Sequence, residues 1–465
     1  MSAVTTTDSA TTTAATSTSA TTTDFTTLFR LKGGWSSAWK ISAAFAVLGL
    51  AGAGAGYAVA PHRFAFSYLF AFIVAVTIGL GAIFFVLIQH LSTAGWSITV
   101  RRSSEFFMTG VFILPILFLP IIPSMHALYP WLEHAGQPAA HGEQGAEHGA
   151  VAHGAAEEEA PAAEIEVLPP PDATAWTGNE EALHHDHHQL VEGKSWFLSE
   201  GKWYASSFLA LALWCLLAWR LFSLSVQQDH TKDVTPTRKL QSFSPGATFI
   251  FALSLTLAVF QWVMSLEPSW YSTIYGVYLF AGCAVSAFAI VIVVTNSWRN
   301  AGLTGNTINL FHMHDLGKMM FGFIVFWAYI GFSQFMLIWY ASIPEETTFF
   351  HQRWELSGWR AVSLMLPIAH FALPFLMLLS RNAKRKLPIL AFGAGWILVM
   401  HVVDIYWLVL PYESATKFAP SWIDFTCLFG VVGAFLTVVF FQMSRYSLVA
   451  VGDPRIGRAM RFHGA

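Results

Sequence analysis

The chain has 465 residues, of which 55% are hydrophobic and 11% are charged, and its formal net charge is −3. Soluble domains carry about 25% charged residues, so a chain this poor in charge cannot cover itself with a water-facing surface. The composition therefore predicts an all-α polytopic membrane protein, and its charge balance gives no sign of a nucleic-acid partner. Cys215, Cys283 and Cys427 lie in apolar segments without metal-ligand spacing. This excludes a C-x-x-C-H haem attachment site and argues against iron–sulfur ligation by this chain.

The N-terminal segment, residues 1–39, is rich in Thr, Ala and Ser, and it lacks the apolar stretch of a secretory signal. A segment of this composition cannot bury enough apolar surface to fold by itself. We therefore predict a disordered tail.

Ten apolar windows follow, each close to the roughly 20 residues that a helix needs to cross the hydrocarbon core. They lie at about residues 40–60, 67–90, 106–128, 204–226, 247–266, 273–296, 318–341, 360–380, 388–411 and 422–444. Prolines within the windows, such as Pro115, Pro367 and Pro374, are tolerated in membrane helices. The sequence thus predicts helices 1–3 within residues 40–128 and helices 4–10 within residues 204–444.

Lysine and arginine predict the orientation of these spans. With the N-terminus placed inside, the inside segments hold about three times as many Lys and Arg residues as the outside segments, as the positive-inside rule requires. Both termini are then cytoplasmic, including the basic tail at residues 445–465. The long loop at residues 129–203 is then outside.

That outer loop is rich in His, Ala and Glu, and it contains the sequence HHDHH at residues 184–188. Histidine-rich tracts can bind Zn, Ni or Cu ions. The spacing is irregular and the backbone is rich in Gly and Ala, which does not preorganise ligands, so a solvated spacer is the simpler interpretation. The sequence leaves both interpretations open.

Ionisable side chains inside the spans are sparse, and such residues usually face a cavity or a partner. The set comprises His312, His314, Asp315 and Lys318 at the inner mouth of the seventh span, His90 at the inner end of the second, His370, His401 and Asp404 near mid-span, and Glu267, Glu413 and Asp424 on the outer side. His401 and Asp404 are three residues apart and share one helix face. Because His titrates near neutral pH, this graded set predicts a proton path across the membrane.

The residues near the two interfaces also have structural interpretations. Headgroups can solvate His90, His312 and His314, and Lys318 can extend to the interface as an anchor. Glu267 can cap the end of the fifth helix. Glu413 and Asp424 can serve as ordinary loop and N-cap residues.

The mid-span residues have two further interpretations. His370 can be a core histidine that bonds a backbone carbonyl. His370 and His401 on neighbouring helices could in principle ligate one b-type haem, but bulky flanking residues and the nearby Asp404 disfavour this.

Four stretches of the chain resemble a known family. They are GLGAIFFVLIQHLSTAGWSITVRRSSE, WVMSLEPSWYSTIYGVYLFAG, HDLGKMMFGFIVFWAYIGFSQFMLIWYASIPEET and HVVDIYWLVLP. In order, they are similar to the second of the two NrfD/polysulfide-reductase-type membrane subunits of bacterial alternative complex III, a quinol:cytochrome c oxidoreductase. The resemblance extends over about residues 40–450, without the Thr-rich tail and the His-rich loop.

The resemblance implies ten helices arranged as two four-helix bundles and two peripheral helices, in a bacterial inner membrane. It implies no haem or cluster in this chain, but haem c and iron–sulfur clusters in partner subunits. The implied partners are the sister membrane subunit, an extrinsic iron–sulfur/molybdopterin-like subunit, a multihaem cytochrome c subunit, other small subunits, lipids and quinol. By motif match it assigns proton-path roles to His90, Glu267, His312, Asp315, Lys318, His401 and Asp404. The role of His370 depends on its depth alone.

These observations predict a membrane subunit of a quinol-oxidising complex that provides a proton path. A quinone pocket, with His or Asp bonding the quinol oxygens, is a second possible role, and no residue of the chain is itself a redox centre. Two alternatives remain. One is a stand-alone secondary transporter, which predicts repeats with broken helices at mid-membrane. The other is an inert scaffold subunit of the same complex.

Overall fold

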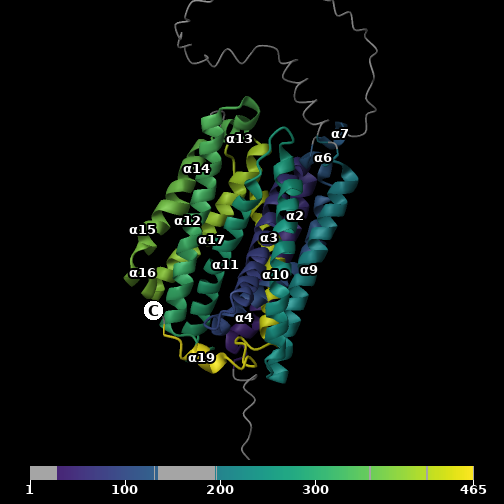
Figure 1. Ribbon diagram of the computed structural model, residues 1–465. Coiled ribbons are helices and arrows are strands. Elements are labelled where there is room, and N and C mark those ends of the chain that lie inside the picture. The colour runs from purple at the N-terminus through teal and green to yellow at the C-terminus, as the bar shows by residue number, and fades with distance from the viewer. Residues whose placement is uncertain are drawn as a thin grey trace, which may run out of the picture.

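A computed structural model describes residues 29–129, 131–134, 194, 196–354, 358–414 and 417–463. These residues form helices and no β-strand. Ten helices are long and apolar enough to cross a membrane. The prediction of an all-α, polytopic membrane protein is therefore confirmed. We call the end of the molecule that carries α19 the lower end and the end that carries α13 the upper end, as they lie in Figure 1.

Seven spans are each built on one long helix, and three contain several helical segments. The long helices are α2 (Ala38–Val59), α3 (Pro61–Leu91), α9 (Glu200–Thr231), α10 (Thr235–Trp262), α11 (Tyr275–Asn300), α12 (Leu310–Ala341) and α18 (Trp422–Arg445). The third span joins α4 (Ile98–Thr109), η2 (Gly110–Ile113), α5 (Leu114–Phe118) and η3 (Leu119–Ile121). The eighth joins α14 (Arg360–Met365), η6 (Leu366–Ala372) and α15 (Leu373–Leu379), and the ninth joins α17 (Leu387–Val409) and η7 (Leu410–Tyr412).

Shorter helices lie at the ends of the spans. They are η1 (Gly33–Ser37), α6 (Met125–Leu128), α7 (Trp131–His134), η5 (Met264–Leu266), α13 (Pro344–Trp354), α16 (Arg381–Arg385) and α19 (Ile456–Met460).

Contacts between the spans group them into two bundles of four and a flanking pair. Figure 1 shows the long helices running side by side. The first bundle contains α3, α4, α9 and α10, and the second contains α11, α12, the eighth span and α17. Helix α3 packs against α11 and joins the two bundles, while α2 and α18 pack on each other and on α3. This is the arrangement that the family resemblance implies.

The flanking pair is held by glycines. A Cβ atom on Gly49 of α2 would lie 2.2 Å from the backbone N of Gly430 on α18, and one on Gly433 would lie 2.8 Å from Ala46 N. Only residues without side chains let two backbones approach so closely, which is a common basis of helix association in membranes.

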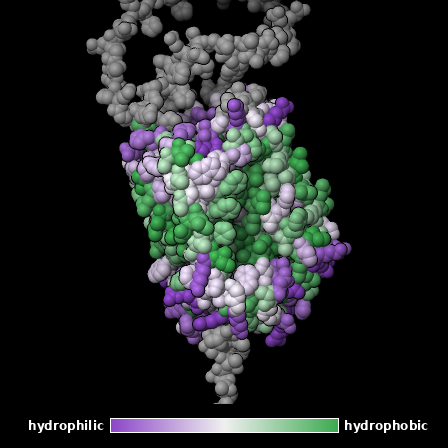
Figure 2. All heavy atoms as spheres, turned by 180° about the vertical axis from the view of Figure 1, so that it is seen from behind, coloured by the Kyte–Doolittle hydropathy of each residue, from purple (hydrophilic) through white to green (hydrophobic). Residues whose placement is uncertain are grey.

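The surface has the pattern expected of a membrane protein. Figure 2 shows an apolar band across the visible face, with hydrophilic side chains gathered above and below it. Large apolar side chains such as Leu48, Trp339 and Leu376 are mostly exposed. Such a surface is stable against hydrocarbon and not against water.

Some predicted boundaries differ from the structure, and others lie outside the described residues. The third span begins at Ile98 and not near residue 106. Charged residues lower the hydropathy of the sequence at its start, although they are paired with one another inside the protein. The predicted N-terminal tail, residues 1–39, includes η1 and the start of α2; its residues 1–28 lie outside the described residues. Most of the predicted outer loop also lies outside them, including residues 135–193, so its metal-binding interpretation stays a prediction.

Candidate functional site

Asp404 lies in α17, where its side chain is buried between two other helices. Its Oδ1 accepts a hydrogen bond from Tyr278 Oη of α11 at 2.5 Å, and its Oδ2 accepts one from Trp327 Nε1 of α12 at 3.0 Å. Within the described residues, no Lys, Arg or His forms an ion pair with this carboxyl group. A buried ionisable group that has donors but no counter-ion, at membrane depth, is the kind of residue that marks a proton or substrate pathway.

His401 lies one helical turn before Asp404 on the same helix. Its Nε2 is 2.9 Å from Thr77 Oγ1 on α3, while its Nδ1 has no hydrogen-bond partner in the described structure. The ring packs on Gly282 of α11, where a Cβ atom would lie 3.0 Å from His401 Cε1. His401 therefore lies at the junction between the two bundles with one ring nitrogen available.

His370 lies in η6, a π-helical segment that contains Pro367 and is followed by Pro374 in α15. Neither ring nitrogen has a partner among the described residues, and the ring centroid is 4.0 Å from that of Trp327. Trp396 Nε1 donates to the Ala369 carbonyl at 2.7 Å and so satisfies one carbonyl of this segment. Single π-helical turns occur frequently at functional sites.

These residues form one group, which we call the central cluster. It consists of Thr77, Tyr278, Trp327, His370, His401 and Asp404. Three of its members were predicted from the sequence. Thr77, Tyr278 and Trp327 were not, because nothing local distinguishes them from other hydroxyl and aromatic residues of the spans.

A cavity of about 450 Å³ adjoins the central cluster, and Tyr278 and Trp327 form part of its wall. The remaining lining comes mainly from apolar side chains of α12, α13, the eighth span and α17. Phe332 and Leu364, which also line it, are 61% and 45% exposed at the apolar surface of the protein. The cavity therefore connects the buried Asp404 partners with the surface that faces hydrocarbon.

Arg353 of α13 supplies the charge of this cavity. Its guanidinium group donates to the carbonyls of Trp407 and Leu408 at the end of α17 and to that of Phe349, at 2.9 to 3.2 Å. It also lies 3.7 Å from the centre of the Phe349 ring. The helix-end carbonyls and the ring stabilise the buried cation, and no acidic residue of the described structure forms an ion pair with it.

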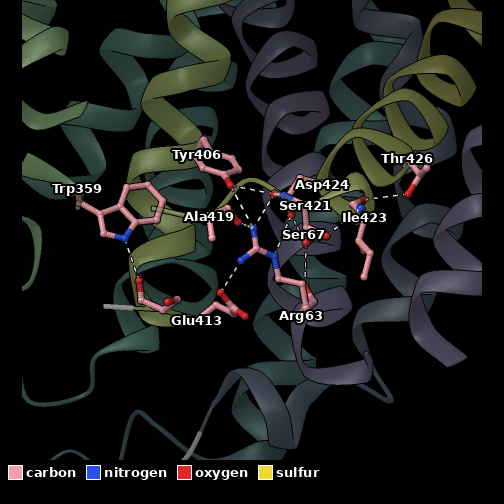
Figure 3. A network of polar contacts seen from close by, with 11 residues as sticks. Arg63, Ser67, Trp359, Tyr406, Glu413, Ala419, Ser421, Ile423, Asp424 and Thr426 are labelled. Atoms are coloured by element: carbon pink, nitrogen blue, oxygen red, sulfur yellow. Dashed lines mark hydrogen bonds and ion pairs between the residues drawn. The ribbon is translucent and has the colours of Figure 1, made fainter. Parts of the chain in front are cut away.

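The predicted outer acids Glu413 and Asp424 belong to a separate network at the upper end (Figure 3). Arg63 forms ion pairs with both acids at 2.6 Å. Asp424 also accepts hydrogen bonds from Ser67 Oγ at 2.6 Å and Tyr406 Oη at 2.8 Å. It is the N3 residue of the capping box that begins α18, with Ser421 as the N-cap. These contacts support the structural interpretation of both acids.

Glu267 lies at the upper end, after η5. Its Oε1 accepts from Ser269 Oγ at 2.5 Å, and its Oε2 accepts from Gln352 Nε2 at 3.3 Å. Nearby, Lys194 Nζ donates to the carbonyls of Pro268 and Ser269. Burial lowers the pKa of Lys194, and the charge of Glu267 opposes this shift in part. Hydrogen bonds thus hold the Glu267 carboxyl group at the turn between α10 and α11.

The predicted inner mouth is a capped helix start. His312 Nδ1 accepts from the Asn309 backbone N–H at 3.1 Å, and His312 Nε2 lies 3.1 Å from the Ala459 carbonyl oxygen. Both ring nitrogens of this buried residue are therefore in use. His312 is the N3 residue of the α12 capping box, with Asn309 as the N-cap.

The other residues of the predicted mouth lie close to His312. Lys318, half exposed, pairs with Asp315 at 2.7 Å, and His314 Nδ1 is 3.6 Å from Asp315 Oδ1. The buried side chains that follow on α12, Met320 and Ile324, are apolar. The structure therefore does not bring residues 312–318 into contact with the central cluster.

A buried ion network that sequence reasoning missed lies at the lower end. We define the lower ion network as Arg101, Arg102, Glu105, Asp229 and Asp453, all of which are at most 5% exposed. Arg101 Nε donates to Glu105 at 2.7 Å, and Arg102 Nη2 donates to Asp229 at 2.6 Å. Arg101 and Asp453 are 3.7 Å apart. In the sequence, Arg101 and Arg102 precede Glu105 by four and three residues, a spacing that favours ion pairs on a helix. This spacing is the one sequence signal that predicts the network.

No protein-family model matches the chain, and no curated protein matches it either. Within the described residues, no group of three His, Cys, Asp or Glu side chains could hold a metal ion. The geometry of the central cluster and its cavity is therefore the main basis for a functional proposal.

Proposed function

We propose that this chain is an integral membrane subunit of a quinol:electron-acceptor oxidoreductase complex of the alternative complex III type. The sequence resemblance supports the class of complex, including partner chains that carry haem c and iron–sulfur clusters. We assign the lower end to the cytoplasm because the lysine and arginine bias favours it. In this proposal the chain moves protons and binds quinol but carries no redox centre.

One observation carries the proposal. Asp404 is buried without a counter-ion among the described residues, and its two hydrogen-bond donors, Tyr278 and Trp327, form part of the wall of a cavity that reaches the lipid-facing surface. Apolar pockets with a few convergent polar groups are typical of small-molecule sites. A quinol is apolar along its tail and polar at its ring, so it suits this cavity.

The residues have distinct roles in this proposal. Tyr278 is placed to pass a proton between the cavity and Asp404, because the residue lines the cavity and its Oη donates to Asp404 Oδ1. The cation of Arg353 faces the same cavity and favours an electron-rich oxygen there. His401 and Thr77 lie behind Asp404 and continue the polar region into α3.

Replacing Asp404 by Asn in the intact complex tests the proton role. The amide keeps the shape of the side chain but cannot carry a proton between two sites. We expect the number of protons released per electron to fall in proteoliposomes, toward the number that quinol oxidation alone produces. Asp233→Asn is the control, because Asp233 lies in an exposed turn between α9 and α10. Unchanged proton release with unchanged turnover would leave only a scaffold.

Filling the cavity tests the quinol role. Ala328 lines the cavity, so Ala328→Trp should occupy it and raise the KM for quinol by about tenfold or more, as expected when about 1.4 kcal/mol of binding is lost. Gly322→Trp is the matched control on α12, because a Cβ atom at Gly322 would meet no atom within 4 Å. Equal KM values for the two variants would exclude this cavity as the quinol site.

A stand-alone transporter is a second candidate, because the third and eighth spans have interrupted helices. Irregular backbone at mid-membrane is a feature of secondary transporters. Uptake of a solute by vesicles that contain this chain alone would favour it. Co-purification with a multihaem cytochrome would favour the complex.

A further inference from the structure

Gln334 is an amide in a stripe of α12 that is otherwise aromatic and aliphatic. The buried residues of the upper half of this helix are Trp327, Ile330, Gln334 and Ile338, at the three- and four-residue spacing of one helix face. Gln334 is only 5% exposed, and it lines the cavity beside Asp404. An amide removed from water costs free energy unless a hydrogen-bond partner satisfies it.

No group in the part of the chain that the structure describes satisfies this amide. Gln334 Oε1 accepts no hydrogen bond there, and Gln334 Nε2 donates none. Neither atom is closed off from open space, in contrast to the buried atoms that lack a partner elsewhere in the protein. Because Gln334 lies on the buried face of α12, the open space that its amide meets is the cavity. Buried polar groups are nearly always satisfied, so the free amide indicates a ligand in the cavity.

The other polar groups of the inner wall are used within the protein or closed off. The two donors to Asp404 use their polar hydrogens there. Ser363 Oγ donates to the Arg353 carbonyl at 2.9 Å and accepts from Trp407 Nε1 at 2.8 Å. Tyr275 Oη has no partner among the described residues, but it is buried away from open space. The α12 amide is therefore the group of this wall that a ligand can reach and that the described protein leaves free.

Gln334 lies above the partners of Asp404. It follows Trp327 by seven residues, which corresponds to two helical turns and about 10 Å along the axis. Trp327 donates to Asp404 Oδ2, so the acid to which we assign proton exchange is at the lower part of the cavity and the amide is at the upper part. A 1,4-quinol carries its two oxygens on opposite edges of its ring, so it can present one oxygen to each group.

An amide suits both oxidation states of such a ligand. Its Nε2 donates and its Oε1 accepts hydrogen bonds. A quinol hydroxyl can donate to Oε1, and a quinone carbonyl can accept from Nε2. The amide does not titrate, so it holds the oxygen in either state without taking its proton.

We propose that Gln334 binds the ring oxygen of the quinol that is remote from Asp404, and that the same amide holds the quinone product. This proposal rests on the proposed function and adds to it the group that orients the ring within the cavity.

Replacing Gln334 by Met tests the proposal, because Met has a similar length and no amide. The substrate is a decyl 1,4-benzoquinol or decyl 1,4-naphthoquinol, whichever the intact complex oxidises faster. We expect the KM for this quinol and the Ki of the corresponding quinone each to rise about fivefold, as expected for one lost hydrogen bond. The kcat and the number of protons released per electron should stay unchanged. Gln442→Met is the matched control, because it removes an amide from α18, which does not line the cavity.

The stability of the ligand-free complex provides a second measurement. Because no described group bonds the Gln334 amide, Gln334→Met should have the Tm of the wild type when no quinol is present. A raised KM together with a lowered Tm would show that the amide serves the fold, and this would overturn the proposal.

The remaining outcomes separate this proposal from the proposed function. An unchanged KM in Gln334→Met, together with a raised KM in Ala328→Trp, would overturn the role of Gln334 and leave the cavity as the quinol site. A raised KM with unchanged inhibition by the quinone would contradict the shared amide. Equal KM values in Ala328→Trp and Gly322→Trp would overturn the quinol site itself.

Discussion

At the scale of single residues, the buried carboxyl groups of Asp424 and Asp404 are stabilised in different ways. Asp424 is neutralised by Arg63 and accepts three further side-chain and backbone bonds. Asp404 has two neutral donors and no ion-pair partner in the described part of the chain. Charge neutralisation fixes the first acid in place, whereas the second is the acid to which the proposed function assigns proton exchange.

The Arg63 network should therefore behave as a structural clamp. Removing one partner of a buried ion pair leaves the other charge uncompensated, which costs about 3–5 kcal/mol. Because Arg63 is slightly exposed, we expect Arg63→Met to cost less than this and to lower the Tm in detergent by several degrees without changing proton release.

A double-mutant cycle provides the control for this prediction. Arg63→Met combined with Asp424→Asn should destabilise the protein less than the sum of the two single changes, because the two groups share one contact. Additive effects would contradict a direct clamp.

Only part of the central cluster could be predicted at this scale. The spacing of His401 and Asp404 fixes their common helix face, and ionisable residues within apolar windows are conspicuous. Their partners are not, since Tyr278 and Trp327 are 126 and 77 residues away from Asp404 in sequence. In a chain with 19 Trp and 12 Tyr residues, composition does not reveal which aromatic side chain turns inward.

At the scale of elements, the α2–α18 pair depends on small residues. A side chain at Gly430 would meet the Leu50 backbone N at 2.7 Å. We expect Gly430→Leu to separate the two helices and to cost at least the 1–3 kcal/mol that is typical of overpacking. Thermal unfolding of the purified protein measures this loss.

Gly54→Leu is the matched control for the glycine contact. Gly54 also lies in α2, but a Cβ atom there would meet no atom within 4 Å. An equal loss of stability in both variants would show that the helix itself, and not its contact with α18, is sensitive to the substitution.

The elements themselves were predictable because hydrophobic length dominates in a bilayer. The exceptions have physical reasons. Arg101, Arg102 and Glu105 make the start of the third span appear polar, although they neutralise one another inside the protein. The π-helical segment around His370 has a carbonyl, that of Ala369, which accepts from the side chain of Trp396 in another span, and a contact of this kind cannot be inferred from local sequence.

At the scale of the whole molecule, the C-terminal segment, residues 446–463, fastens the lower end. The Ala459 carbonyl oxygen contacts His312 Nε2, and the Phe462 carbonyl accepts from Asn309 Nδ2 at 2.9 Å. Asp453 contacts Arg101. The sequence predicts only a basic tail here. Its docking depends on groups from α4, α9 and α12, and such contacts between distant segments cannot be inferred from the composition of the segment.

The docking of this segment should depend on pH. Burial alone would raise the pKa of Asp453, but the hydrogen bond from Arg455 and the charge of Arg101 outweigh it, and the pKa lies below the usual 3.8. A lowered pKa stabilises the docked state above the unperturbed value, and this stability is lost as the pH falls through the lowered pKa. We therefore expect the segment to stay docked at neutral pH and to loosen only in acid, below about pH 4.

Hydrogen exchange over residues 446–463 measures this effect, after correction for the intrinsic pH dependence of exchange. Protection should be complete at pH 6 and reduced near pH 3 in the wild-type protein, whereas Asp453→Asn should be less protected at both. Equal protection of the variant and the wild type at pH 6 would contradict the prediction.

The cavity opens beside Phe332 and Leu364, and the position of this opening determines which ligand concentration sets the occupancy of the cavity. A molecule that enters there comes from the hydrocarbon phase, so its mole fraction among the lipids sets the occupancy, and its aqueous concentration matters only through partitioning. Diluting the protein with more bilayer at a fixed total amount of ligand should therefore weaken the apparent binding, even though no contact within the protein has changed.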